Sequence, residues 1–220
     1  MNDVIEQINL QIEKCSLLKH KFYKMWSEGE LTNDHLKGYS KEYFQLVKSV
    51  PQFVQNISQL TNDPSVKAVL TETLNEESEH IDLWVKFAVG LGVPKEELLD
   101  YQGSGKTNDA VSQLKNLMSF SLEEGAGAMY AYEMEIPKIS RSKLEGLKKF
   151  YGVDNSHDDG NTTRYFEIHE QVDIRHAANW RQMLENLADE SKTKSVFESA
   201  VRSLEAQNKL LDSVQEKYVA

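Results

Sequence analysis

The sequence of 220 residues has little cysteine and proline, and it lacks any long run of apolar residues. Its single cysteine, Cys15, excludes a disulfide within the chain and fits a reducing compartment. No segment approaches the ~20 apolar residues of a membrane-spanning helix, and the N-terminal stretch lacks the apolar core of a signal peptide. We therefore expect a cytoplasmic protein with no membrane partner.

Positive charge is also scarce in this sequence. The chain holds 25 Lys and Arg against 35 Asp and Glu, a formal net charge of -10, and no basic cluster stands out. An acidic surface repels phosphate backbones, so nucleic acid is not an expected partner.

The low content of proline and glycine favours helices, because both residues interrupt them. The sequence has only 4 prolines and 11 glycines, and its apolar residues recur at three- and four-residue spacing. Thr32 is the expected N-cap of the second helix, Pro51 should kink that helix, and Pro137 separates the fourth helix from the fifth. We predict a single all-α domain over residues 1–220, with a short helix in "GLGVPKEELL" and a polar loop in "GVDNSHDDGN". The seven main helices are expected at about residues 2–26, 32–60, 64–89, 108–135, 138–151, 162–187 and 192–217.

The stretch "HEQVDIRH" in the sixth predicted helix carries the clearest chemical pattern. His169, Asp173 and His176 are spaced i, i+4 and i+7, so their side chains fall within roughly 60° of arc on one helix face. Imidazole and carboxylate together suit iron, manganese or zinc. The alternative is that the three polar residues lie on a solvated face.

The third predicted helix carries the turn "EESEH". Glu77 and His80 are spaced i, i+3, and Glu76 and His80 are spaced i, i+4, so either pair could meet at one metal. Glu77 lies nearer the centre of the helix's apolar stripe than Glu76. A solvated charged turn is the alternative.

The fourth predicted helix is apolar until it reaches Glu133 and Glu135, in "GAGAMYAYEMEIPKI". Glu133 continues the face of Ala126 and Tyr130, so we expect it to be buried, and a buried carboxylate needs a partner or a metal. We expect Glu135 to be exposed. Three helices thus each offer inward acids or imidazoles, and together they predict a two-metal site suited to oxygen activation. Its candidate ligands are Glu76 or Glu77, His80, Glu133, His169, Asp173 and His176.

Four stretches carry a resemblance to a known family: "FYKMWSEGELT", "HIDLWVKFAVGLGVPKEEL", "YAYEMEIPKISRSKLEGLKKFYG" and "HEQVDIRH". The chain resembles the heme-oxygenase-like di-metal oxidases, and among them the CADD-like proteins. The resemblance spans nearly the whole chain, and the His-x3-Asp-x2-His spacing is specific. It implies the helical bundle shared by heme oxygenase, TenA and PqqC.

The resemblance also implies an activity. CADD-like proteins hold two divalent metals, iron with iron or iron with manganese, and use dioxygen and an external reductant. They take part in making 4-aminobenzoate, a folate precursor, from one of their own tyrosines, with a lysine as amine donor. Those residues map onto Tyr23 and Lys143, and further tyrosines of the family map onto Tyr39 and Tyr43. Without the resemblance, Tyr23 is better interpreted as a core aromatic and Lys143 as a surface lysine.

One departure from the family leaves a ligand open. The stretch between the third-helix glutamate and its histidine is shorter here, so alignment from the N-terminal side selects Glu76, whereas helical phase selects Glu77. We retain both and prefer Glu77. The abbreviation CADD stands for chlamydial protein associating with death domains, but we infer no death-domain role from that name.

Other functions remain open at this point. The same fold could act on an external substrate by N-oxygenation or oxidative decarboxylation. A thiaminase-like hydrolase would need Cys15 as nucleophile, although we expect Cys15 to be a buried small hydrophobe. Haem binding would use His20, and a helical adaptor would bind no metal. The sequence does not fix the oligomeric state, and a homodimer is one open alternative.

Overall fold

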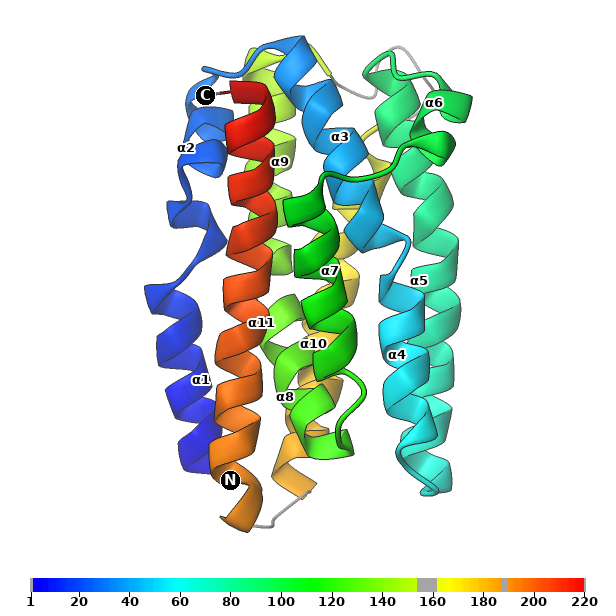
Figure 1. Ribbon diagram of the computed structural model, residues 1–220, viewed down its shortest axis with the longest axis vertical. Coiled ribbons are helices and arrows are strands. Elements are labelled where there is room, and N and C mark those ends of the chain that lie inside the picture. Colours follow the sequence, from blue (N-terminus) through cyan, green and yellow to red (C-terminus); the bar gives the residue numbers. More distant parts are fainter. Residues whose placement is uncertain (1, 154–161, 187–189, 220) are drawn as a thin grey trace.

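The computed structural model describes residues 2–153, 162–186 and 190–219, and these residues form helices with no strand among them (Figure 1). The longer helices run roughly parallel to the long axis of the molecule (Figure 1). The all-α prediction is confirmed. The helices are α1 (Asn2–Lys14), α2 (Lys21–Glu28), α3 (Asn33–Val47), α4 (Val50–Gln59), α5 (Pro64–Gly90), α6 (Lys95–Asp100), α7 (Gly105–Leu117), α8 (Leu122–Glu133), α9 (Ile136–Phe150), α10 (Arg164–Asn186) and α11 (Thr193–Val214).

The helix α10 contacts several other helices of the bundle. It packs against α5, α8 and α9, while α11 covers α1, α7 and α8. The large aromatic side chains Trp26, Trp84 and Trp180 are fully buried between these elements. The inward faces of α5, α8 and α10 therefore meet inside the core. No helix in the described part of the chain is both long and apolar enough to cross a bilayer.

The first predicted helix, residues 2–26, is in fact two helices with a break at residues 15–20. Glu135 explains the break: it accepts hydrogen bonds from the Ser16 hydroxyl and, at 2.9 Å, from the Leu17 backbone N–H. The His20 side chain then caps α2 by accepting from Phe22 N at 3.1 Å. A partner distant in sequence thus replaces the helical hydrogen bonds. Glu135 is half-buried in this role, and the expectation that it is exposed was wrong.

The second predicted helix, residues 32–60, also divides in two. Thr32 caps α3 as predicted, accepting from His35 N at 3.3 Å. The helix ends at Val47, four residues before Pro51, where the proline ring would clash with the carbonyl and no N–H is available. Pro51 instead lies in the first turn of α4, so the prediction of a mere kink was wrong.

The fourth predicted helix, residues 108–135, becomes α7 and α8. Ser104 caps α7 by accepting from Thr107 N at 3.2 Å, and Ser121 caps α8 by accepting from Glu124 N at 3.2 Å. Both serines stand outside the periodic apolar pattern and mark helix starts. The remaining predicted helices match α5, α9, α10 and α11 within a few residues, and the short helix is α6. Most of the predicted polar loop, residues 154–161, lies outside the described residues.

Small residues let α8 pass through the centre of the bundle. A Cβ on Gly127 would lie 2.8 Å from Val196 Cγ1 and 3.0 Å from the Val196 carbonyl oxygen of α11. A Cβ on Gly125 would lie 2.8 Å from Ile57 of α4. This close packing places Glu133, at the end of α8, in the interior with 1% of its surface exposed.

Candidate metal centre

The predicted face of α10 points into the core. His169, Asp173 and His176 are exposed by 3%, 1% and 0%, so the solvated alternative does not hold for them. His169 Nδ1 lies 2.6 Å from the Tyr165 carbonyl oxygen in the preceding turn, a contact in which Nδ1–H donates. That bond leaves Nε2 of His169 as its free ligand atom.

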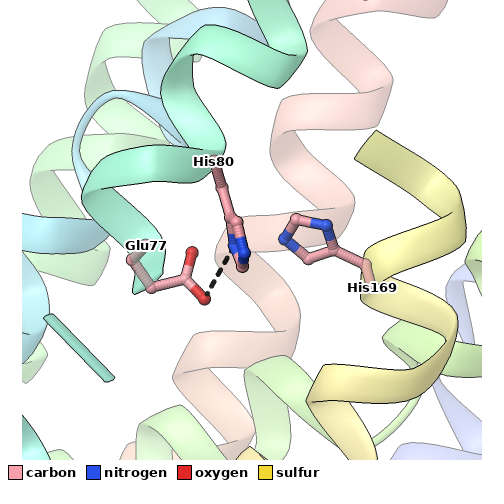
Figure 2. Close-up of side chains that lie close together, drawn as sticks. All are labelled: Glu77, His80 and His169. Atoms are coloured by element: carbon pink, nitrogen blue, oxygen red, sulfur yellow. Dashed lines mark ion pairs between the residues drawn. The ribbon is translucent and has the colours of Figure 1, made fainter. Parts of the chain in front are cut away.

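The helix α5 presents Glu77 and His80 to α10. Both are buried, and His80 Nδ1 lies 3.5 Å from Glu77 Oε1 (Figure 2). The His80 and His169 rings face each other across the helices with centroids 4.5 Å apart (Figure 2). Glu76 is half-buried on the outer side of the same turn. Helical phase therefore identified the inward glutamate.

The helix α8 contributes Glu133. Its Oε2 accepts a hydrogen bond of 2.7 Å from Trp180 Nε1, which fixes the carboxylate from the α10 side. His176 Nδ1 lies 3.9 Å from this Oε2 and 3.4 Å from Glu77 Oε1. A histidine of α10 thus faces carboxylates from both α5 and α8.

These side chains form two clusters that share Glu77. One holds Glu77, His80 and His169, and the other holds Glu77, Glu133 and His176; within each, the ligand atoms lie within 4.8 Å of one another. A carboxylate common to both clusters would be able to contribute to both metal positions. Asp173 lies beside the second cluster, with Oδ1 3.3 Å from His176 Nδ1. The structure therefore brings together the predicted ligands except Glu76.

Several polar atoms of the centre lack a hydrogen-bond partner in the described part of the chain. Among the described residues, four buried atoms here have no hydrogen-bond partner: His80 Nδ1, Glu133 Oε1, Asp173 Oδ2 and His176 Nδ1. Leaving one buried polar group unsatisfied costs about 1–3 kcal/mol. Such a set of orphaned nitrogen and oxygen atoms fits divalent cations, which bind carboxylate and imidazole in mixed sets.

The charges of the centre are coupled in the metal-free protein. Burial raises the pKa of Glu133 well above its usual value. Burial also opposes ionisation of Glu77, but the neighbouring histidines outweigh it and lower the pKa of Glu77. For His176, the surrounding carboxylates outweigh burial and raise the pKa to about 10. The site thus holds protons that bound cations would displace.

A second buried cluster of polar side chains, which we call the tyrosine–lysine pocket, is formed by residues of α2, α3 and α9. Tyr23, Tyr39 and Lys143 are exposed by 4%, 0% and 5%. The Lys143 amine donates to the Tyr39 hydroxyl, which lies 3.3 Å from the Tyr23 hydroxyl. Lys143 Nζ also lies 4.6 Å from the centroid of the Tyr23 ring and 5.0 Å from that of Tyr43. The interpretation of Lys143 as a surface residue was therefore wrong.

Among the described residues no carboxylate contacts the Lys143 amine, and the rings of Tyr23, Tyr39 and Tyr43 lie around it. Burial lowers the pKa of Lys143 well below its usual value and raises the pKa of Tyr23 and Tyr39 well above theirs. The pocket therefore favours a neutral amine beside neutral phenols, which leaves the lysine lone pair free for nucleophilic chemistry.

Two aromatic residues that the sequence analysis did not select connect the two sites. The Tyr165 ring stacks on His169 at 4.0 Å, and Trp84 packs edge-on to Tyr165 at 4.7 Å. Trp84 stacks in turn on Tyr43 at 5.2 Å. Tyr165 precedes His169 by four residues, so its place on the same face of α10 was a usable signal; Trp84 gave no signal beyond the apolar stripe.

A surface groove of about 440 Å³ lies beside the metal centre, with Asp173 in its lining. It runs between α8, α9 and α10. The exposed side chains of Met134 and Ile174 line it, with Lys138 and Arg181 nearby. A small molecule in this groove would lie next to a candidate metal ligand.

The residues of the rival functions lie elsewhere. Cys15 is half-buried between α1 and α2, where its Sγ lies 3.1 Å from Gln11 Nε2, so the expectation of a fully buried cysteine was wrong. His20 caps α2 with one ring nitrogen, and the other lies 3.2 Å from Asp212. Neither residue belongs to the clustered ligands.

Comparison with known proteins places the chain among enzymes. Residues 37–208 match the family model described as iron-containing redox enzyme. A 4-aminobenzoate synthase from Chlamydia pneumoniae is 33% identical over 93% of this chain and 92% of its own length. A 4-aminobenzoate synthase from Nitrosomonas europaea is 29% identical over 100% of this chain and 94% of its own.

Solved structures share the fold. A TenA homologue from Pseudomonas syringae superposes with a TM-score of 0.85 at 14% identity, covering 97% of this chain and 93% of that one. A CADD-like protein of unknown function from Nostoc punctiforme gives 0.78 at 17% identity, covering 100% and 98%. With the match to the chlamydial proteins, these findings agree on one assignment. The chain belongs to the heme-oxygenase-like iron-containing redox enzymes, as a relative of the CADD-like 4-aminobenzoate synthases.

Proposed function

We propose that this protein is a dioxygen-dependent di-metal oxygenase that makes 4-aminobenzoate from its own Tyr23, with Lys143 as the amine donor. The observation that carries the proposal is the burial of the Lys143 amine against the Tyr23 ring, without a carboxylate partner in the described residues. Burying a lysine without a charged partner costs folding free energy. Such a residue is therefore a candidate for a chemical role. The similarity to 4-aminobenzoate synthases from Chlamydia pneumoniae and Nitrosomonas europaea supports the same product.

The proposed product accounts for the atoms of both side chains. The Tyr23 ring and its Cβ supply the carbon skeleton, and the Cα–Cβ bond breaks. Cβ is oxidised from a methylene to the carboxylate, and the phenolic C–O bond is replaced by a C–N bond. The nitrogen comes from Lys143: its amine condenses with the oxidised ring carbon, the phenolic oxygen leaves as water, and hydrolysis of the Cε–Nζ bond leaves Cε as an aldehyde. Cα of the spent tyrosine stays in the chain as a glycine-type carbon. Dioxygen is the oxidant, and an external reductant supplies the remaining electrons.

In this proposal the metal centre and the tyrosine–lysine pocket have separate roles. Glu77, Glu133 and the α10 motif would hold two iron ions, or one iron and one manganese. Bound there, the metals supply the capacity to activate dioxygen. Tyr39 keeps the Lys143 amine and the Tyr23 hydroxyl in one place by contacting both. The closed aromatic walls exclude water from the amine.

The experiment that tests this proposal uses protein carrying carbon-13 in its tyrosine rings and nitrogen-15 in its lysines. The protein is loaded with iron, with and without manganese, and then given reductant and air. We expect 4-aminobenzoate that carries both labels, detected by mass spectrometry. Tyr23→Phe should abolish the product, whereas Tyr151→Phe, which removes a hydroxyl outside the pocket, should not. Unlabelled product, or product from Tyr23→Phe, would contradict the proposal.

A second candidate function is oxidation of an external substrate. The groove beside Asp173 supports it, because a small molecule there would lie next to the metal centre. This candidate predicts bound metal, dioxygen consumption without labelled 4-aminobenzoate, and loss of activity when Ala177→Phe fills the groove. The self-sacrificing oxygenase predicts that Ala177→Phe still yields labelled product.

A further inference from the structure

Glu76 lies on the outer side of His176, opposite the metal centre. Glu76 Oε2 is 2.8 Å from His176 Nε2, whereas Glu77 Oε1 is 3.4 Å from His176 Nδ1. Successive residues of α5 differ by about 100° in direction, so the two glutamates reach the imidazole from different sides. One histidine ring is therefore held between neighbouring carboxylates of the same helix turn.

The two nitrogens of His176 face different surroundings. Nδ1 faces Glu77, Asp173 and Glu133 and has no hydrogen-bond partner in the described residues. Nε2 has one close partner, the Glu76 carboxylate, which can only accept. In the neutral ring that a bound metal requires, the hydrogen therefore belongs on Nε2, and the lone pair of Nδ1 faces the cluster.

Arg175 holds Glu76 in this place. Its guanidinium lies 2.5 Å from Glu76 Oε1 and 2.7 Å from Glu72 Oε1, so each oxygen of Glu76 has its own partner. These contacts run from an exposed glutamate to a histidine with no exposed surface. Glu76 is absent from both clusters of candidate ligands, so it is not needed as a ligand itself.

We propose that Glu76 is a positioning residue, which accepts a hydrogen bond from His176 Nε2–H. This hydrogen bond sets the orientation of the ring, so that Nδ1 points to the metal centre. Arg175 keeps the Glu76 carboxylate in place. Carboxylates bonded to a ligating histidine orient the ring and raise its basicity. The inference rests on the metal site of the proposed function and is independent of the fate of Tyr23. It also gives Glu76 and Glu77 separate roles.

The test uses Zn²⁺, which is diamagnetic and binds the same ligand types. Nitrogen-15 NMR of the Zn²⁺-loaded full chain should show His176 coordinated through Nδ1 with a proton on Nε2. Glu76→Ala should weaken Zn²⁺ binding by about 10- to 100-fold, the range for loss of a carboxylate behind a ligating histidine. Glu76→Gln keeps an acceptor but loses the pair with Arg175, so its loss should be smaller and its ring orientation retained.

The matched control is Glu79→Ala, an exposed site on the same helix that should leave Zn²⁺ affinity unchanged. Circular dichroism of each metal-free variant checks that the fold is intact. Coordination through Nε2, unchanged affinity in Glu76→Ala, or no Zn²⁺ bound by the wild type would each overturn the inference. If the protein binds metal as described but yields no labelled 4-aminobenzoate, the proposed function fails and the role of Glu76 stands.

Discussion

The buried amine of Lys143 is required by the proposed reaction but lowers the stability of the folded protein. Its amine is buried among aromatic rings, with the Tyr39 hydroxyl as hydrogen-bond partner. Methionine has nearly the same length and no charge to desolvate. We expect Lys143→Met to abolish 4-aminobenzoate formation while raising the free energy of unfolding by about 1–3 kcal/mol. Denaturant unfolding and product analysis of the same preparation measure both effects, and a destabilised variant would contradict this view of the pocket.

The burial of Lys143 should also make the stability of the protein depend on pH. In the folded protein burial holds the pKa of Lys143 well below its usual value of 10.5. Between the two values the unfolded chain holds a proton that the folded chain lacks, so rising pH stabilises the fold. We expect the stability of the wild type relative to Lys143→Met to rise with pH up to about 10.5 and then level off. Unfolding curves across that range test it; a parallel profile for the two proteins would contradict it.

Single residues also show what the sequence could reveal. The spacing of His169, Asp173 and His176 was sufficient to predict that they share one face of a helix. Spacing alone did not say whether that face is buried or solvated, and the acids on two other helices were what favoured an inward face. Helical phase selected Glu77 over Glu76, because Glu77 lies nearer the centre of the apolar stripe of its helix. The position of Glu135 was not predictable, because its partners Ser16 and Leu17 lie more than 100 residues away in sequence.

At the scale of elements, α8 depends on glycine for its depth in the bundle. A methyl group on Gly127 would meet both a side-chain atom and the backbone oxygen of Val196. We expect Gly127→Ala to lower the free energy of unfolding by about 1–3 kcal/mol, because the backbone of α11 must shift. Trimming the contact with Val196→Ala should restore only part of the loss, since the carbonyl oxygen stays in place.

Gly105→Ala is the matched control for this prediction. Gly105 lies in the first turn of α7 with nothing within 4 Å of an added Cβ, so this variant should be neutral or more stable by up to about 1 kcal/mol. Chemical denaturation of the three variants gives the comparison. Equal effects at Gly127 and Gly105 would show that helix propensity, not close packing, governs α8.

Element boundaries were the least predictable part of the fold. Periodicity located every stretch of helix, but it could not separate α1 from α2 or α7 from α8, since the apolar pattern continues across each break. Those breaks depend on capping serines and on tertiary partners such as Glu135. Pro51 was a visible signal, and its effect at Val47 follows from the clash four residues earlier.

At the scale of the whole molecule, the metal centre joins α5, α8 and α10. Ligands on three helices exist together only in the folded chain, so bound metal should stabilise the fold. At a free metal concentration of about 100 times the dissociation constant, the expected gain is about 2.7 kcal/mol per site. We expect Fe²⁺ under anaerobic conditions to raise the Tm, and a chelator to reverse the rise.

Glu77→Ala provides the sharpest variant for this effect, because Glu77 belongs to both clusters. It should remove most of the metal-dependent rise in Tm, while the exposed Glu79→Ala should keep it. Differential scanning calorimetry with and without metal measures the difference. An undiminished rise in Glu77→Ala would place the metals elsewhere.

The burial of Tyr23 and Lys143 has a consequence for the lifetime of the protein in the cell. Under the proposed function, one reaction removes the interior side chain of Tyr23 and the amine of Lys143 from the contact between α2 and α9. Losing a buried aromatic side chain alone costs about 3–5 kcal/mol, a large part of the stability of a typical domain. The reacted chain would therefore open more often and become a preferred target for proteases. Its amino acids would return to protein synthesis, and the supply of product would follow the rate at which new chains are made.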